Sequence, residues 1–352
     1  MAEARDCARR GFASRVIAWQ ADHGRHDLPW QQTRDPYRIW LSEIMLQQTQ
    51  VQTVLPYYAS FLLRFPTLQA LAAAPLDSVL ERWSGLGYYA RARHLHRCAQ
   101  VIAAGGGRLS ADPEENAGLP GIGRSTAAAI SVFAFGRRAA ILDGNVKRVL
   151  ARCFAAEAAA TAAQDERQMW ALAESLLPAR DIEGYSQGMM DLGATVCTRH
   201  KPRCELCPLR EICLACRDGR QAELPRRRAR RAPAQRLCSL LLLSDGRRIL
   251  LERRPPVGIW GGLLSLPEAS ADSATAFAER HGCRLLSSRA LTPIEHSFTH
   301  FRLTMQVLHC QVEALGLQAN QALLEWLPVD EVAAAALPAP IKKLLLALPR
   351  GR

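Results

Sequence analysis

Four closely spaced cysteines are the sequence feature that most restricts how this chain can fold. They follow the spacing C-x6-C-x2-C-x5-C, at Cys197, Cys204, Cys207 and Cys213. Proline and charged residues between them indicate a surface loop and not an apolar core. Thiolates bind soft metal centres. The spacing therefore admits a 4Fe–4S cluster on these four thiols, or a zinc ion on Cys204, Cys207, Cys213 and Cys216.

Residues 1–216 predict an all-α domain, because apolar residues recur at helical spacing. Two starts are well marked, since Asp35-Pro36 and Asp112-Pro113 each place an N-cap before a proline at the first helical position. We expect helices over 14–20, from Pro36 onward, and over 49–64, 67–73, 76–83, 88–104, 113–118, 124–135, 145–160, 164–177 and 185–196.

Residues 217–236 interrupt this pattern and predict a basic linker between two domains. They contain eight Arg and two acidic residues. Their net charge of +6 is half of the net charge of +12 carried by the whole chain. Residues 237–352 then predict an α+β domain. We expect strands at 237–243, 249–251 and 303–308, helices near 270–281 and at the C-terminus, and a hairpin turn at Asp245-Gly246.

The charge and the termini restrict the partners of the chain. A net charge of +12 indicates that the binding partner is a polyanion, with nucleic acid favoured over anionic lipid. No apolar run approaches the ~20 residues of a membrane span, and the N-terminus resembles neither a signal nor a transit peptide. We expect a monomeric cytoplasmic protein. In that compartment the eleven cysteines are thiols or metal ligands and not disulfides.

A glycine-containing turn joins two of the predicted helices. The string Leu119-Pro120-Gly121-Ile122-Gly123-Arg124-Ser125 precedes the helix expected over 124–135. Gly121 and Gly123 let the backbone approach a ligand closely, and the N–H groups that begin the next helix point the same way. This arrangement predicts a sequence-independent site for a DNA phosphate. The alternative is an ordinary corner between two helices.

Two carboxyl groups are candidates for acid–base chemistry. Asp143 stands at the N-cap position of the helix expected from 145, where the helix dipole favours an ionised carboxylate. Glu43 lies among apolar residues, and in a dry pocket its pKa would rise and make it a proton donor. One neutral and one charged carboxyl form the pair that cleaves a glycosidic bond. Taken singly, Asp143 is more often a cap and Glu43 a solvated side chain.

Together these motifs resemble the helix–hairpin–helix DNA glycosylases of the endonuclease III superfamily, and within it the adenine-excising branch. The strongest strings are LSEIMLQQTQV at 41–51, WSGLGYYARAR at 83–93, LPGIGRSTA at 119–127, ILDGNVKRVLARC at 141–153 and QGMMDLGATVCT at 187–198. The likeness extends from about Leu28 to the C-terminus. It implies a helical glycosylase domain holding one 4Fe–4S cluster on the cysteine quartet, followed by a Nudix (MutT)-like domain.

The resemblance also implies an activity. Enzymes of this branch hydrolyse the N-glycosidic bond of adenine paired with 8-oxoguanine or guanine in double-stranded DNA. By this likeness Glu43 protonates the flipped adenine at N7 and Asp143 stabilises the cationic sugar. Ser125 stands where lyase-competent relatives carry a nucleophilic Lys, so the likeness implies a monofunctional enzyme that leaves an abasic site.

Further positions match DNA-contact and base-pocket residues of the family. Gln48, Leu86 and Tyr88 match positions that probe the duplex, and Trp30 and Gln187 match the adenine pocket. Judged by the residues alone, Leu86–Tyr89 favours a packed helix start. The loop between Cys197 and Cys204 would hold Arg199 and Lys201 outward toward phosphate.

The C-terminal region resembles the module that reads 8-oxoguanine. The family's F-S-H string is here Phe298, Thr299 and His300. The Nudix hydrolase signature is missing after Gly262, so we expect no pyrophosphohydrolase activity. Two alternatives remain: an endonuclease III-like enzyme acting on oxidised pyrimidines, and a damage-binding protein without catalysis.

Overall fold

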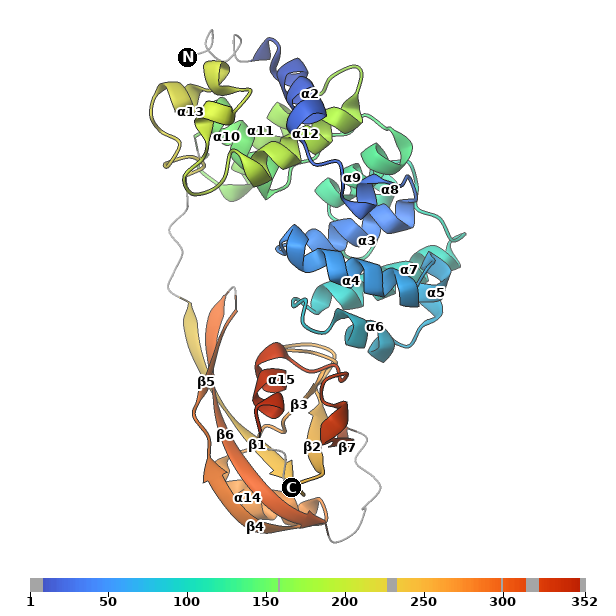
Figure 1. Cartoon of the computed structure of the whole chain (residues 1–352), viewed down its shortest axis with the longest axis vertical. Helices are drawn as coiled ribbons and strands as arrows, with labels where there is room; N and C mark the ends of the chain where they lie inside the picture. Colours follow the sequence, from blue (N-terminus) through green and yellow to red (C-terminus); the bar gives the residue numbers. More distant parts are fainter. Residues whose placement is uncertain (1–8, 158, 227–232, 299, 315–322, 349–352) are drawn as a thin grey trace. The chain divides into compact units, whose positions relative to one another are not determined.

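A computed structural model describes residues 9–157, 159–226, 233–298, 300–314 and 323–348 (Figure 1). The chain divides into two compact units. One comprises residues 1–58, 65–72 and 97–229, and the other comprises 59–64, 73–96 and 230–352. No helix in the described ranges is long and apolar enough to cross a membrane.

The predicted helices of the N-terminal part are present. They are α2 (Phe12–His23), α3 (Pro36–Leu46), α4 (Val51–Arg64), α5 (Leu68–Ala73), α6 (Leu76–Trp83), α7 (Ala90–Ala104), α8 (Pro113–Ala117), α9 (Arg124–Phe135), α10 (Gly144–Cys153), α11 (Ala162–Ser175) and α12 (Ile182–Thr195). Both marked starts are confirmed: the Asp35 side chain accepts from the Tyr37 N–H, and that of Asp112 from the Glu114 N–H, each at 2.9 Å.

One helix end differs from expectation. The helix predicted over 145–160 ends at Cys153, because Ala155 has a φ of +45° and cannot continue a right-handed helix. Shorter elements complete this part of the chain: η1 (Pro29–Gln31), η2 (Cys204–Leu206), η3 (Arg210–Ile212) and α13 (Leu214–Arg217).

Helix α12 is held close to two neighbours because it carries glycine at the contacts. A Cβ atom on Gly188 would lie 2.8 Å from Val16 Cγ1 of α2, and one on Gly193 would lie 2.6 Å from Asn145 Cβ of α10. Both distances are shorter than side chains tolerate. The apolar faces of α2, α10, α11 and α12 share one buried core, which includes Phe12, Val149, Trp170 and Leu192. The glycines therefore set how deeply α12 sits against the residues that face it.

The described residues of the C-terminal unit form a seven-stranded sheet. Its strands are β1 (Ala234–Ser244), β2 (Arg248–Arg253), β3 (Leu264–Ser265), β4 (Cys283–Ala290), β5 (Ile294–Ser297), β6 (Phe301–Ala314) and β7 (Leu324–Pro328), and the main path runs β3-β2-β1-β6-β4. Strands β1 and β2 pair antiparallel across the predicted Asp245-Gly246 turn. Strands β1 and β6 pair in parallel from Ala234 and Phe301 onward.

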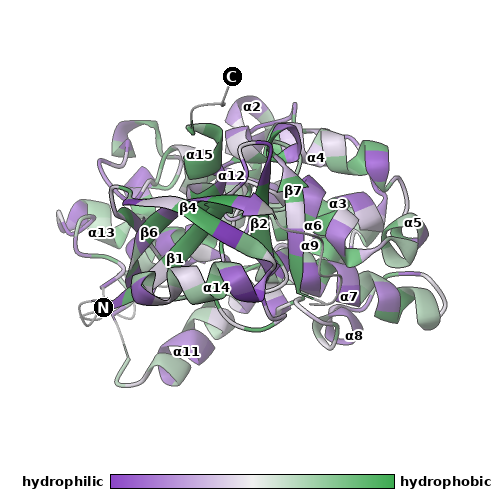
Figure 2. Ribbon diagram, turned by 90° about the horizontal axis from the view of Figure 1, so that it is seen from below, coloured by the Kyte–Doolittle hydropathy of each residue, from purple (hydrophilic) through white to green (hydrophobic). Residues whose placement is uncertain are grey.

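Both faces of this sheet are covered, which explains the uninterrupted leucine run of β1. Leu240 and Leu242 pack toward α15 (Ala339–Leu346). Leu241 and Leu243 pack toward α14 (Ala274–Arg280). The hydrophobic colour accordingly runs along β1 in Figure 2. A strand buried on both faces needs apolar residues at successive positions.

The predicted boundary of the linker at 236 is wrong by three residues. Strand β1 begins at Ala234, because its first residues pair with β6 although their side chains are exposed. Part of the arginine run, residues 227–232, lies outside the described ranges. The division into domains at 216 and 237 otherwise stays a prediction.

Candidate active site

One large cavity in the first unit gathers several of the residues singled out above. Its volume is about 1580 Å³, and its wall is formed by α3, the start of α9, the start of α10, α12 and the segment before α3. The predicted residues that line it are Trp30, Glu43, Ser125, Asp143 and Gln187. These side chains come from five separate segments of the sequence. The fold therefore brings together both carboxyl groups and both residues assigned to the base pocket.

Glu43 projects from α3 into this cavity. Burial is the main cause that raises its pKa from 4.5 to about 8, and the nearby charge of Asp143 adds to the effect. Its sequence neighbours Ser42, Ile44 and Met45 are buried. Glu43 is therefore mostly protonated near neutral pH and is suited to donate a proton.

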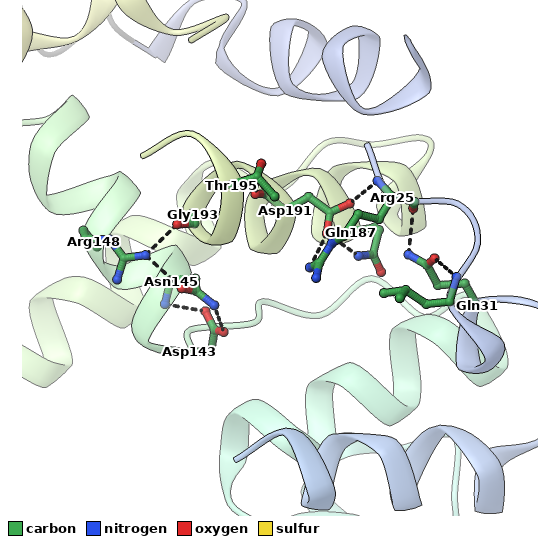
Figure 3. Close-up of polar contacts among 10 residues, drawn as sticks. Arg25, Gln31, Asp143, Asn145, Arg148, Gln187, Asp191, Gly193 and Thr195 are labelled. Carbon is green, nitrogen blue, oxygen red and sulfur yellow. Dashed lines mark hydrogen bonds and ion pairs between the residues drawn. The ribbon is translucent and has the colours of Figure 1, made fainter. Parts of the chain in front are cut away.

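Asp143 is the N-cap of α10, as predicted. Its Oδ1 accepts from the N–H groups of Asn145 at 2.9 Å and Val146 at 2.7 Å, and its Oδ2 accepts from Asn145 Nδ2 at 3.2 Å (Figure 3). The sequence predicted that the helix N-terminus favours the ionised carboxylate, and the hydrogen bonds from Asn145 and Val146 act in that direction. Burial raises the pKa of Asp143 above its ordinary value, and the three hydrogen bonds only oppose that rise. The hydrogen bonds nevertheless favour the anion at Asp143, whereas no hydrogen bond among the described residues favours it at Glu43.

Arg148 links this carboxylate to the cysteine loop. Its Nη2 donates to Asn145 Oδ1 at 2.8 Å and to the Gly193 carbonyl at 2.6 Å, and its Nε donates to the Cys197 carbonyl at 2.8 Å. Figure 3 shows the guanidinium between Asn145 and Gly193. Sequence reasoning missed Asn145 and Arg148, although their positions two and five residues after Asp143 lie on the same helix start.

A second polar network is centred on Asp191 of α12, four residues after Gln187. The Gln187 Nε2 donates to Asp191 Oδ1 at 2.9 Å. Asp191 is fully buried and also accepts from Arg25, through the backbone N–H at 2.8 Å and through Nε at 2.7 Å. Gln31 in turn donates to the Arg25 carbonyl at 2.9 Å. Sequence reasoning missed Arg25 and Asp191. The signal available was the four-residue spacing of Gln187 and Asp191, which places them on one helix face.

The helix–hairpin–helix turn connects α8 and α9. Gly121 has a φ of +76°, which only glycine adopts without strain, and Gly123 is the N-cap of α9 with open space around its Cα. Ser125 follows on the first turn of α9, and its Oγ accepts from the Leu142 N–H at 3.2 Å. The hydroxyl therefore ties the hairpin to the segment that leads into Asp143.

Three residues assigned to duplex contacts do not line the cavity. Gln48 is exposed in the turn after α3, with a φ of +57°. Leu86 and Tyr88 belong to the other unit. Leu86 is buried as a packed helix start would require, but Tyr88 is 49% exposed with a φ of +51°, and α7 begins only at Ala90. The packed reading thus holds for Leu86 and not for Tyr88.

The cysteine quartet lies in the loops between α12 and α13. The thiol of Cys207 has a pKa raised to about 12, first by burial and then by the nearby Cys197, Cys213 and Cys204 thiols, so these thiols lie close enough to interact electrostatically. Arg152 Nη1 donates to Cys197 Sγ at 3.4 Å. No set of three or more described His, Cys, Asp or Glu side chains is arranged to hold a single metal ion. Arg199 and Lys201 are exposed on the same loop.

An aromatic cluster surrounds the Phe298 string in the C-terminal unit. Phe298 stacks on Phe301 with ring centroids 4.5 Å apart, and it contacts His296 at 4.6 Å and Trp260 at 5.6 Å. His300 is exposed. Thr299 lies outside the described residues.

Comparisons with known proteins agree with this arrangement. Residues 41–175 match the model of the HhH-GPD superfamily of base excision DNA repair proteins, and residues 238–347 match a NUDIX domain. The fold resembles a thermostable thymine-DNA glycosylase, with a TM-score of 0.55 and 30% identity over 61% of this chain and 99% of that one. It also resembles an endonuclease III–DNA complex, with a TM-score of 0.52, 21% identity, and coverage of 60% and 95%. The helical domain and its two-carboxyl cavity thus define a helix–hairpin–helix DNA glycosylase.

Two full-length relatives narrow the assignment. The adenine DNA glycosylase of Buchnera aphidicola subsp. Baizongia pistaciae is 32% identical over 338 residues, which are 95% of this chain and 95% of that protein. That of Homo sapiens is 32% identical over 400 residues, covering 95% of this chain and 73% of the human protein. This chain belongs to the adenine DNA glycosylase family, and it is a base excision repair enzyme that hydrolyses N-glycosyl bonds.

Proposed function

We propose that this enzyme is a monofunctional glycosylase that removes adenine paired with 8-oxoguanine or guanine and leaves an abasic site. The observation that carries the proposal is the pair of carboxyl groups at one cavity. Burial raises the pKa of Glu43 to about 8, while Asp143 accepts three hydrogen bonds that favour its anion. Near neutral pH Glu43 therefore holds its proton, whereas Asp143 is the anion.

The reaction follows from these two protonation states. The adenine leaves the base stack and enters the cavity, because a paired base is sterically inaccessible. Glu43 donates its proton to adenine N7, and the electrons of the bond between N9 and the sugar carbon pass into the departing base. The anionic Asp143 stabilises the positive charge that develops on the sugar. Water then adds to that carbon, and Glu43 takes up the released proton.

Ser125 supports a monofunctional reaction. A lyase forms a Schiff base through an amine, and a hydroxyl group cannot do so. No lysine is among the described residues that line the cavity. The hydroxyl of Ser125 is instead engaged by the Leu142 N–H.

We assign DNA contacts to residues of both units, most of them exposed. The backbone at Gly121 and Gly123 binds a phosphate, since both are exposed and no Cβ obstructs the N–H groups at the start of α9. Arg199 and Lys201 contact further phosphates. Exposed Gln48 and half-exposed Tyr88 probe the duplex, with the ring of Tyr88 suited to wedge between bases. Leu86 is buried, and only its match to a family position assigns it to the duplex. Trp30 borders the adenine, and its ring meets Tyr58 edge-on at 5.3 Å.

We assign one 4Fe–4S cluster to Cys197, Cys204, Cys207 and Cys213. These four thiols would hold the cluster, since a 4Fe–4S cluster takes four Cys ligands. The hydrogen bond from Arg152 favours the thiolate form of Cys197. The bound cluster would supply a rigid support for the loop that carries Arg199 and Lys201.

The reading of 8-oxoguanine is assigned to Phe298, Thr299 and His300. The aromatic contacts of Phe298 hold one end of this string against the sheet. The hydroxyl of Thr299 is the group proposed to hydrogen-bond the damaged base. The adjoining Nudix-like domain lacks the hydrolase signature in its sequence, and we propose that it recognises DNA without hydrolysing nucleotides.

A single-turnover assay tests the proposal. The substrate is a duplex with one 8-oxoguanine:adenine pair, analysed with and without alkaline treatment. We expect free adenine, with strand cleavage only after alkali. Cleavage without alkali would show a lyase, whereas release of oxidised pyrimidines in place of adenine, or binding without release, would support one of the two alternative functions.

A further inference from the structure

Asp191 is placed behind the cavity wall, where it contacts the base-pocket residue Gln187 but not the cavity itself. Gln187 lines the cavity, whereas Asp191 does not. The Asp191 side chain is fully buried and is paired with Arg25, whose Nη2 lies 2.5 Å from Oδ1. A carboxylate with three donors from Arg25 is firmly held in one orientation.

The charge of Asp191 determines which way the Gln187 amide points. An ionised carboxylate only accepts hydrogen bonds, so Gln187 must turn its NH₂ group toward Asp191. The observed contact is of this kind, from Nε2 to Oδ1 at 2.9 Å. The amide oxygen of Gln187 then lies on the side away from Asp191 (Figure 3). The wall of the cavity consequently presents a hydrogen-bond acceptor at this position.

Adenine and 6-oxo purines differ in the group that would meet this acceptor. Adenine offers an N7 acceptor and an amino donor at C6, whereas guanine offers acceptors at both positions. Glu43, as a proton donor, complements N7 in either base. An acceptor at Gln187 complements only the amino group, and it opposes an oxygen at C6.

We propose that Asp191 is a positioning residue that selects a 6-amino purine over a 6-oxo purine by fixing the Gln187 amide with its oxygen toward the base. The inference rests on the proposed function, and it adds the residue that sets base selectivity. In this account Arg25 holds Asp191, Asp191 orients Gln187, and only Gln187 touches the base.

The test compares release of adenine and of hypoxanthine, each placed opposite 8-oxoguanine, in single-turnover assays. The Asp191→Asn variant can donate to Gln187, so the glutamine amide is free to turn its NH₂ group toward the base. We expect the ratio of adenine rate to hypoxanthine rate to fall roughly tenfold or more, in line with the loss of one base-edge contact. Equal slowing on both bases would show a merely structural Asp191 and would overturn the inference.

A second variant keeps the buried ion pair intact. Gln187→Met retains Asp191 and Arg25, and it removes the amide that reads the base. We expect a similar loss of the adenine preference, and an unchanged preference would overturn the inference even if Asp191→Asn did not fold. Adding Asp191→Asn to Gln187→Met should change the ratio no further, because Asp191 acts through Gln187. A further fall in the double variant would contradict that route.

Two controls separate the possible failures. Glu313→Gln removes an exposed carboxylate paired with Arg284 in the C-terminal unit and should leave the ratio unchanged. If wild-type protein released no adenine, the proposed function would fail, and this inference with it. Wild-type activity combined with an unmoved ratio in the Gln187 variant would refute only the inference.

Discussion

The protonation of Glu43 makes a quantitative prediction about the dependence of the reaction on pH. A pKa of about 8 leaves roughly nine tenths of Glu43 protonated at about pH 7, whereas its ordinary pKa of 4.5 would leave roughly 0.3%. The protonation of Glu43 should therefore leave the rate of base release nearly independent of pH up to about neutral pH. It should fall about tenfold per pH unit well above pH 8, as the general acid is lost.

The acidic side of the profile depends on Asp143. Because its pKa is raised above the ordinary value, the anion is lost as pH falls through that raised pKa, and the rate should fall with it. The complete profile is bell-shaped. The Glu43→Gln variant should lose roughly 10²–10⁴-fold in rate, and its residual activity should lack the alkaline limb while binding to lesion DNA persists.

The same pKa has a consequence for folding. The folded-state pKa of Glu43 lies above the unfolded value, so its contribution to stability is complete below about pH 4.5 and is lost as pH rises through about 8. The rise corresponds to at most about 5 kcal/mol. Glu43→Gln should therefore unfold at a higher temperature than wild type at alkaline pH, with the difference shrinking toward acidic pH.

Single-turnover rates on an 8-oxoguanine:adenine duplex, measured across pH for both proteins, check the kinetic part, and thermal unfolding across the same range checks the folding part. A wild-type alkaline limb that persists in Glu43→Gln would assign it to another group. A limb centred near the ordinary glutamate pKa would refute the argument that burial in the cavity keeps Glu43 protonated.

Three further predictions concern other parts of the molecule. Asp143→Asn keeps a good helix cap but removes the charge, so stability should change little while single-turnover rate falls roughly 10²–10³-fold; a rate within tenfold of wild type would exclude charge stabilisation by Asp143. Thr299→Ala should reduce the preference for 8-oxoguanine over guanine opposite adenine; unchanged discrimination would mean that the Phe298–His300 string does not read the lesion. Neutralising Arg226–Arg228 should reduce the number of counterions released on DNA binding by up to about three, which lowers the slope of log affinity against log salt concentration. An identical slope would place the linker away from phosphate.

Local sequence signals predicted most of the helices and the chemistry of single residues. The Asp35-Pro36 and Asp112-Pro113 starts are confirmed because caps and first-turn prolines act within a few residues. The leucines of β1 and the Asp245-Gly246 turn predicted two paired strands for the same reason. Strands β3, β4, β5 and β7 were missed, since their pairing depends on partners distant in the sequence.

The amino-acid sequence by itself determined the inventory of this protein: the helix starts, the hairpin glycines, the cysteine quartet and two carboxyl residues one hundred positions apart. Only the tertiary structure decided the environment of each group. It placed Glu43 and Asp143 at one cavity, raised the pKa of both, and put Asp191 behind Gln187. The physical reason is that capping and turn formation are local, whereas burial, charge proximity and buried hydrogen bonds arise only between segments that folding brings together.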